Sequence, residues 1–231
     1  MNFGLEIFVS LVIVALVIFF CFRILPRNAN VIVFFIDNKK YLSPNCISNW
    51  RKYLGAPTVL TFIFAVMVEN DLLAYISVWI FVFLAISDLL DGAVARNCNM
   101  MTPEGAKLDA QADKWFDLPA LFAFCLFPVY EPIYFIIVSC IAIFDIIGQF
   151  IRGKNSPPEA GIIGKAKTTV KFICIYLMSF AGRYDEIYQL LKLETVILIL
   201  LFLALLLAGL SMGMKTKWYH DYIRKYIQDY V

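Results

Sequence analysis

The stretch SDLLDGAVARNCNMMTPEGAKLDAQADK, residues 87–114, carries four aspartates in a chain that is otherwise strongly apolar. Of the 231 residues, 61% are hydrophobic and 16% are charged, whereas soluble domains have about 25% charged residues. A water-soluble domain of this size has too little interior to bury so many apolar side chains. The composition therefore predicts an integral membrane protein, and the four carboxylates need surroundings that make their charge tolerable.

The apolar segments predict an all-α membrane fold. Residues 1–25 are interpreted as an extra N-terminal transmembrane helix, because the apolar run is long enough to span a bilayer. Residues 26–54 are expected to form a linker and an interfacial amphipathic helix, residues 55–214 a six-helix membrane domain, and residues 215–231 a basic cytoplasmic tail. The six expected helices lie at about 55–69, 72–96, 103–129, 131–152, 163–182 and 192–213.

The charges of the connecting segments predict the topology. Basic residues such as Arg96 and Lys107 alternate along the chain with acidic loops, and the positive-inside rule places the basic set in the cytoplasm. Arg23 and Arg27 likewise place the end of the first helix in the cytoplasm and Met1 outside. We therefore expect a multi-pass protein whose aspartate-rich stretch faces the cytoplasm. The net charge of +2 does not favour a nucleic-acid partner.

The linker contains two expected local structures. Residues 31–42 have an apolar run followed by a polar turn, a pattern compatible with a short hairpin. Residues 43–54 are typical of an amphipathic helix on the membrane surface, with Ser43 as its N-cap. In this interpretation Arg51 and Lys52 meet lipid headgroups.

The four aspartates fall on two helices. The sequence Thr102-Pro103-Glu104 is typical of a helix start, so Asp109 and Asp113 are expected one turn apart on one face of the following helix. Asp88 and Asp91 share a face near the end of the preceding helix. An antiparallel pair of helices can bring these two faces together.

The cost of the charges points to a metal site. An aspartate at the centre of a membrane helix costs roughly 2.5–3.5 kcal/mol, so four would cost about 10 kcal/mol or more. We expect them in a wet cavity near the interface, neutralised by cations. Carboxylates without neighbouring histidine or cysteine ligands suit Mg²⁺ or Mn²⁺. Four of them have room for two ions, a pair suited to chemistry at phosphorus.

The residues beside the aspartates suit a phosphorylated ligand. Gly92 and Ala95 leave space for close approach to the backbone, and Arg96 offers donors that fit a diphosphate. Two alternatives remain at this point. The aspartates would be helix-end residues in salt bridges with Arg96, Lys107 and Lys114, or they would belong to a divalent-cation transporter, whose acids are expected near the bilayer midplane.

The pattern resembles a known family. Asp88-x-x-Asp91-Gly92-x-x-Ala95-Arg96, then eight residues, then Gly105-x-x-x-Asp109-x-x-x-Asp113 is similar to the signature of the CDP-alcohol phosphatidyltransferases at all eight positions. The resemblance covers roughly residues 44–213 and implies a six-helix core, with residues 1–43 outside it. The segment that enters this core also looks like the family's, through Pro44, Asn45, Ser48, Arg51 and Pro57.

The resemblance implies a reaction. A phosphatidyl group would pass from CDP-diacylglycerol to an alcohol in phospholipid biosynthesis, with release of CMP and with Asp113 as the general base. The implied metal ligands are Asp88, Asp91, Asp109 and Asp113. The implied nucleotide-binding residues are Asp91, Gly92, Ala95, Arg96 and Gly105. The implied partners are CDP-diacylglycerol, a small phosphorylated alcohol and the lipid bilayer, and a homodimer is expected from the family alone.

A second, basic cluster bears on the acceptor. Gly164-Lys165-x-Lys167-Thr168 is similar to a segment of the family members that make phosphatidylglycerophosphate, and Arg152 also has a counterpart there. Arg152, Lys165 and Lys167 are therefore candidate ligands of the phosphate of glycerol 3-phosphate. The sequence departs from those members at Phe144-Asp145, where they often have Arg-Glu. Inositol phosphate, serine or a phospholipid remain as alternative acceptors.

Overall fold

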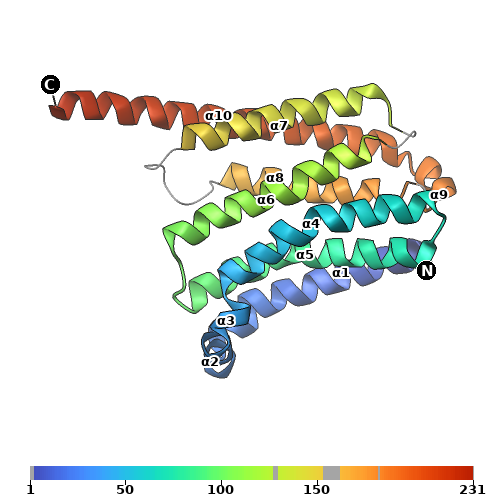
Figure 1. Cartoon of the computed structure of the whole chain (residues 1–231), viewed down its shortest axis with the longest axis horizontal. Helices are drawn as coiled ribbons and strands as arrows, with labels where there is room; N and C mark the ends of the chain where they lie inside the picture. Colours follow the sequence, from blue (N-terminus) through green and yellow to red (C-terminus); the bar gives the residue numbers. More distant parts are fainter. Residues whose placement is uncertain (1–2, 127–129, 153–161, 182, 231) are drawn as a thin grey trace. The chain divides into compact units, whose positions relative to one another are not determined.

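The protein is described here from a computed structural model, which covers residues 3–126, 130–152, 162–181 and 183–230. Within these residues the secondary structure is helical, without strands, as expected for an all-α protein. The order of the helices along the chain can be followed in Figure 1. The chain divides into two compact units. The first unit comprises residues 1–120 and 182–184, and the second comprises residues 121–181 and 185–231.

The first unit contains the N-terminal helices and the aspartate motif. Its elements are α1 (Phe3–Phe19), the π-helical turn η1 (Phe20–Ile24), the 3-10 turn η2 (Leu25–Arg27), α2 (Ala29–Asp37), α3 (Lys39–Leu42), α4 (Pro44–Met67), α5 (Asp71–Asn97) and most of α6 (Pro103–Phe124). α4 and α5 lie side by side over much of their length (Figure 1). α1 also contacts α5, and this places the N-terminal helix beside the motif helix.

Side chains cap the helices of this unit where the sequence predicts. Ser43 accepts a hydrogen bond from the backbone N–H of Cys46 at 3.3 Å and begins α4. Thr102 accepts one from the N–H of Gly105 at 3.0 Å, so the expected start of α6 is confirmed. Each bond satisfies one of the backbone donors that a helix start leaves open.

The hairpin expected over residues 31–42 is wrong, because α2 and α3 form there instead. The side chain of Asn28 accepts hydrogen bonds from the N–H groups of Asn30 and Val31 and so begins a helix. A helix then turns Phe35 inward to a buried cluster, in which Val31 also packs. An isolated two-stranded hairpin is only marginally stable, whereas this helix buries an apolar face.

The interfacial helix and the next apolar segment were expected as two elements, but they form the single helix α4. Pro57 lies inside it. Its buried residues recur every three or four positions along the whole helix, which is the spacing of one helix face. They are Pro44, Ile47, Ser48, Arg51, Gly55, Thr58, Val59, Phe62 and Ala65.

The second unit is built around a long C-terminal helix. Its elements are α7 (Pro132–Arg152), α8 (Ile162–Met178), α9 (Asp185–Leu190) and α10 (Leu193–Tyr230). α10 contacts both α7 and α8. Residues 215–230, expected as a separate tail, continue α10.

Four of the described helical segments are long and apolar enough to cross a membrane: Phe3–Arg27, Asp71–Asn97, Pro132–Ile151 and Leu193–Lys217. The first of these agrees with the N-terminal transmembrane helix expected from the sequence. Each of the six later apolar stretches overlaps one helix of the structure, α4 to α8 or α10. The six-helix membrane core itself stays a prediction.

Candidate active site

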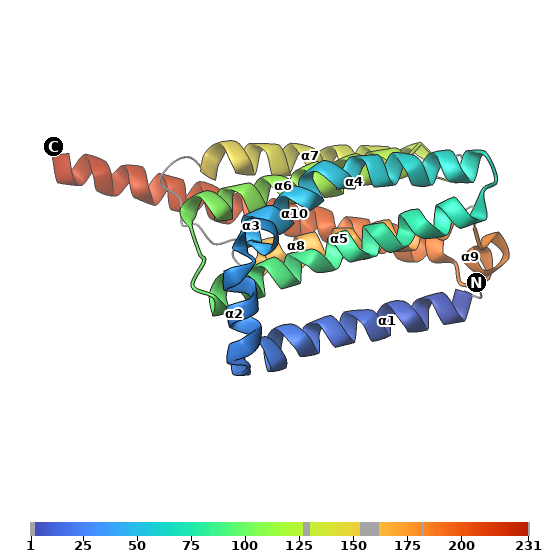
Figure 2. The ribbon, with the colours of Figure 1, turned by 60° about the horizontal axis from the view of Figure 1, so that its bottom comes forward.

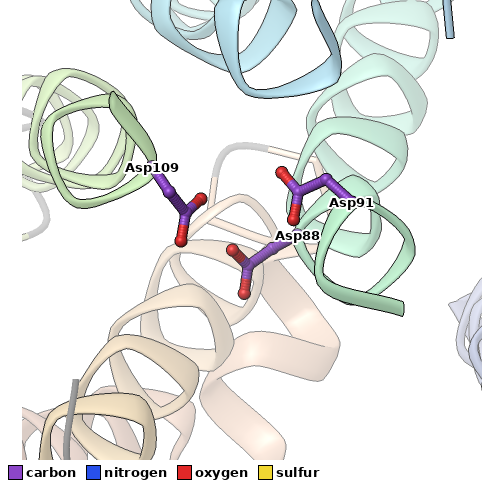
Figure 3. Close-up of side chains that lie close together, drawn as sticks. All are labelled: Asp88, Asp91 and Asp109. Carbon is purple, nitrogen blue, oxygen red and sulfur yellow. The ribbon is translucent and has the colours of Figure 1, made fainter. Parts of the chain in front are cut away.

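Three aspartates of the motif converge from two helices of the first unit. Asp88 and Asp91 lie near the end of α5, and Asp109 lies on α6. One carboxylate oxygen from each lies within 4.8 Å of the other two. Figure 3 shows the three carboxylates turned toward one another across the gap between the helices. The convergence of the two aspartate faces is as predicted from the helical spacing.

The guanidinium of Arg51, from α4, binds this cluster. It donates to Asp88 at 2.6 Å and to Asp91 at 3.2 Å, and it also donates to Asp109. Its side chain is 0% exposed. Burial alone would lower the pKa of Arg51, but the surrounding carboxylates, Asp113 foremost, raise it above its usual range, so this side chain keeps its charge.

The expected placement of Arg51 among lipid headgroups is therefore wrong. Its position on α4 belongs to the buried stripe of that helix, three residues after Ser48. The Ser48 hydroxyl donates to the same Asp91 oxygen at 2.9 Å. Arg51 and Ser48 are thus the functional residues that the charge pattern missed. Both of these residues lie on α4, the helix that precedes the motif.

Asp113 completes the cluster one turn further along α6. Its Oδ1 lies 3.5 Å from Nε of Arg51, and both atoms are buried without a hydrogen-bond partner. A buried carboxylate oxygen that accepts no hydrogen bond keeps an unused lone pair. Asp113 therefore lies where a proton or a metal ion would satisfy it.

The residue types suit a divalent cation. Three carboxylates with oxygens within 4.8 Å, and a fourth with an orphaned buried oxygen, form a hard oxygen donor set. Such a set suits Mg²⁺ or Mn²⁺. Arg51 brings one positive charge to four carboxylates, and this imbalance favours a further cation there.

The two glycines of the motif, Gly92 and Gly105, have different neighbours. A Cβ at Gly92 would lie 3.3 Å from a guanidinium nitrogen of Arg96, which is itself exposed. A Cβ at Gly105 would lie 2.6 Å from Oδ1 of Asn45. The glycine at 105 thus has a packing reason, namely the close approach of α4 to the start of α6. Nucleotide binding by Asp91, Gly92, Ala95, Arg96 and Gly105 stays a prediction.

The basic cluster of the second unit has an acidic centre. Lys167 donates to one oxygen of Asp145, and Lys171 donates to the other at 2.9 Å. Asp145 and both lysines are buried. Lys165 is exposed, on another face of α8, and α7 ends at Arg152, whose side chain lies outside the described part. Lys167 is therefore held in a buried network, whereas Lys165 is not buried.

The fold and the carboxylate cluster agree with one class of membrane transferase. A family model for CDP-alcohol phosphatidyltransferase matches residues 41–220, and the chain belongs to this family of enzymes. No solved structure matches the chain.

Two curated relatives carry a more particular name. The chain is 32% identical over 145 residues to a CDP-diacylglycerol–glycerol-3-phosphate 3-phosphatidyltransferase of Aquifex aeolicus, which covers 62% of this chain and 78% of that protein. It is 29% identical over 148 residues to the protein of the same name from Wigglesworthia glossinidia brevipalpis, covering 61% and 78%. α1 and α2 lie before the matched family region.

Proposed function

We propose that the protein transfers the phosphatidyl group of CDP-diacylglycerol to glycerol 3-phosphate and releases CMP. The observation that carries the proposal is the convergence of Asp88, Asp91 and Asp109, with oxygens within 4.8 Å of one another. The names of the two curated relatives support the choice of glycerol 3-phosphate as acceptor. The four apolar helices support a location in the bilayer, where the acyl chains of the donor would also lie.

The donor would bind at the aspartate cluster. Asp88, Asp91, Asp109 and Asp113 would hold one or two Mg²⁺ or Mn²⁺ ions, which when bound supply positive charge to the diphosphate. Arg51 keeps the carboxylates turned toward one point, through its bonds to Asp88 and Asp91. Arg96 is exposed beside Gly92, where its guanidinium is available to the cytidine diphosphate.

The transfer would use Asp113 as the base. The acceptor hydroxyl attacks the phosphorus that bears the diacylglycerol, its proton passes to Asp113, and a new P–O bond forms. The bond between that phosphorus and the oxygen of CMP breaks, and CMP leaves with the electron pair. Oδ1 of Asp113 is buried and accepts no hydrogen bond, which supports this role, since a base needs an acceptor atom that can take the proton.

The acceptor's phosphate would bind the basic cluster of the second unit. Lys167 is the strongest candidate, because Asp145 orients its ammonium group and Lys171 shares the charge of that carboxylate. Lys165 and Arg152 would contribute from the exposed face of α8 and the end of α7. We place this active site on the cytoplasmic side, as the positive-inside count predicts.

The test is an acceptor panel with the purified full-length protein. Labelled CDP-diacylglycerol and Mg²⁺ are supplied with glycerol 3-phosphate, inositol phosphate, serine, a phospholipid or no acceptor, and CMP release is measured. We expect release with glycerol 3-phosphate above all others. Greater release with another member of the panel would contradict the proposed acceptor while leaving the transferase chemistry intact.

A further inference from the structure

The N-terminal helix α1 carries a buried acid, although it lies before the region that matches the family. Glu6 is 0% exposed, and Arg183 holds both of its carboxylate oxygens, with distances of 3.0 and 3.1 Å. The side chain of Arg183 is 3% exposed. A buried ion pair is costly to form in an apolar environment unless its hydrogen-bond geometry is good. A bidentate arginine–carboxylate pair has the most favourable geometry.

Aromatic residues of the transferase domain enclose this ion pair. The hydroxyl of Tyr184 donates to Glu6 at 2.8 Å and also bonds the hydroxyl of Tyr75 on α5. The Arg183 guanidinium lies 5.2 Å from the ring centre of Tyr75 and 5.8 Å from that of Phe62 on α4. Glu6 is therefore connected to α5 through Tyr184 and to α4 through Arg183.

The turns η1 and η2, which follow α1, pack against the motif segment of α5. Cys21 and Leu25 are 3% and 0% exposed and belong to one buried cluster with Ala93 and Val94. Ala93 and Val94 lie inside the segment Gly92–Arg96 of α5. η1 and η2 both contact α5, and so does α2, which turns away from α1 at this point (Figure 2).

The two attachments lie far apart along one helix axis. Glu6 and Cys21 are 15 residues apart in the sequence, which corresponds to about 22 Å of helix. Glu6 reaches Tyr75 through Tyr184, and Cys21 shares a buried cluster with Val94. Tyr75 and Val94 are near opposite ends of α5. α1 therefore runs parallel to α5 and is fixed near both ends. A plain membrane anchor needs neither a buried acid nor a matched apolar contact at its far end.

We propose that α1 is a fixed helix of the catalytic domain, which holds the segment Gly92–Arg96 of α5 in position. Glu6 anchors α1 near its N-terminus, and Leu25, on the turn η2 that follows α1 and η1, anchors the other end. Both act as positioning residues, since neither touches the carboxylate cluster. The anchoring by Glu6 does not depend on which alcohol the enzyme accepts.

The anchor at Glu6 is tested by a double-mutant cycle in the full-length protein. Glu6→Gln and Arg183→Met each leave a buried charge without its counter-ion, so each should lower the thermal midpoint in detergent by about 5 °C or more. The double variant removes both charges and should recover a large part of that loss. Additive losses in the double variant, or single variants with the wild-type midpoint, would overturn the anchor. This arm needs no substrate.

The positioning role is tested by Leu25→Ala against Leu11→Ala. Leu11 is on the same helix and is 63% exposed. We expect Leu25→Ala to raise the KM for CDP-diacylglycerol about tenfold with the KM for the acceptor unchanged, because the change acts on the donor motif alone. Leu11→Ala should leave both values unchanged. Equal effects on the two KM values, or a fall in kcat alone, would overturn the positioning role while the stability cycle still decides the anchor.

Discussion

Arg51 donates a hydrogen bond to Asp88 at 2.6 Å from a fully buried position on α4. The same guanidinium contacts Asp91, Asp109 and Asp113, so one cation holds together carboxylates from two helices. Without it, four negative charges would face one another with no positive side chain of α4 between them. The arrangement means that a cation of the protein itself already holds the carboxylates together.

Removal of Arg51 should make folding depend on metal. Arg51→Ala leaves the carboxylates without their protein cation, and loss of one partner of a buried ion network costs about 3–5 kcal/mol. We expect a lower thermal midpoint in EDTA, and a larger rise on addition of Mg²⁺ than in the unmodified protein. The neighbouring variant Lys52→Ala serves as the control. An equal Mg²⁺ response in all three proteins would count against the role of Arg51.

Asp113→Asn should abolish most of the activity and leave the fold intact. The amide cannot accept the hydroxyl proton, and general-base catalysis is worth about 10²–10⁴ in rate. CMP release at saturating substrates measures the loss, and Glu104→Gln, at an exposed position on the same helix, is the matched control. Full activity in Asp113→Asn would show that another group is the base.

Lys167→Gln should weaken the acceptor site selectively. The change removes a buried ammonium group that Asp145 orients, so the KM for glycerol 3-phosphate should rise at least about tenfold with the KM for CDP-diacylglycerol unchanged. The exposed Lys165 provides a comparison through Lys165→Gln, which should have a smaller effect. A larger effect at Lys165 than at Lys167 would move the acceptor's phosphate to the exposed face of α8.

The contact between α4 and α6 should tolerate no added methyl group. A Cβ at Gly55 would lie 2.3 Å from the ring of Phe116 and 3.2 Å from its backbone Cα, so Gly55→Ala should destabilise the protein by about 1–3 kcal/mol. Gly213 has nothing within 4 Å of that position, and Gly213→Ala should be neutral or stabilising by up to about 1 kcal/mol. Thermal unfolding of the two variants in detergent compares them, and equal midpoints would be inconsistent with this packing.

The sequence predicted the elements whose signals are local. The four aspartates meet because their spacings of three and four residues each define one helix face, and Thr102 begins α6 because it follows a common capping pattern. The N-terminal helix, which is long and apolar enough to cross a membrane, is predicted from its length and hydropathy alone.

The failures came from long-range contacts. Arg51 is predicted at the membrane surface because it is charged. Its spacing of three or four residues from Ile47, Ser48 and Gly55 instead indicates the buried face of α4. Residues 31–42 formed helices instead of a hairpin because Phe35 packs against Cys21 and Leu25, a contact that no local pattern encodes. Glu6 had no sequence signal for a partner that follows it by 177 residues.

The most direct test of the proposed reaction follows both halves of the product at once. The full-length protein is incubated with CDP-diacylglycerol labelled in its acyl chains and with glycerol 3-phosphate labelled in its phosphate, in Mg²⁺ or in EDTA. We predict one lipid product that carries both labels, formed in equal amount with CMP, and no product in EDTA or with Asp91→Asn. CMP release without a doubly labelled lipid, or undiminished transfer in EDTA, would contradict the assignment of the aspartate cluster as the metal-dependent transfer site.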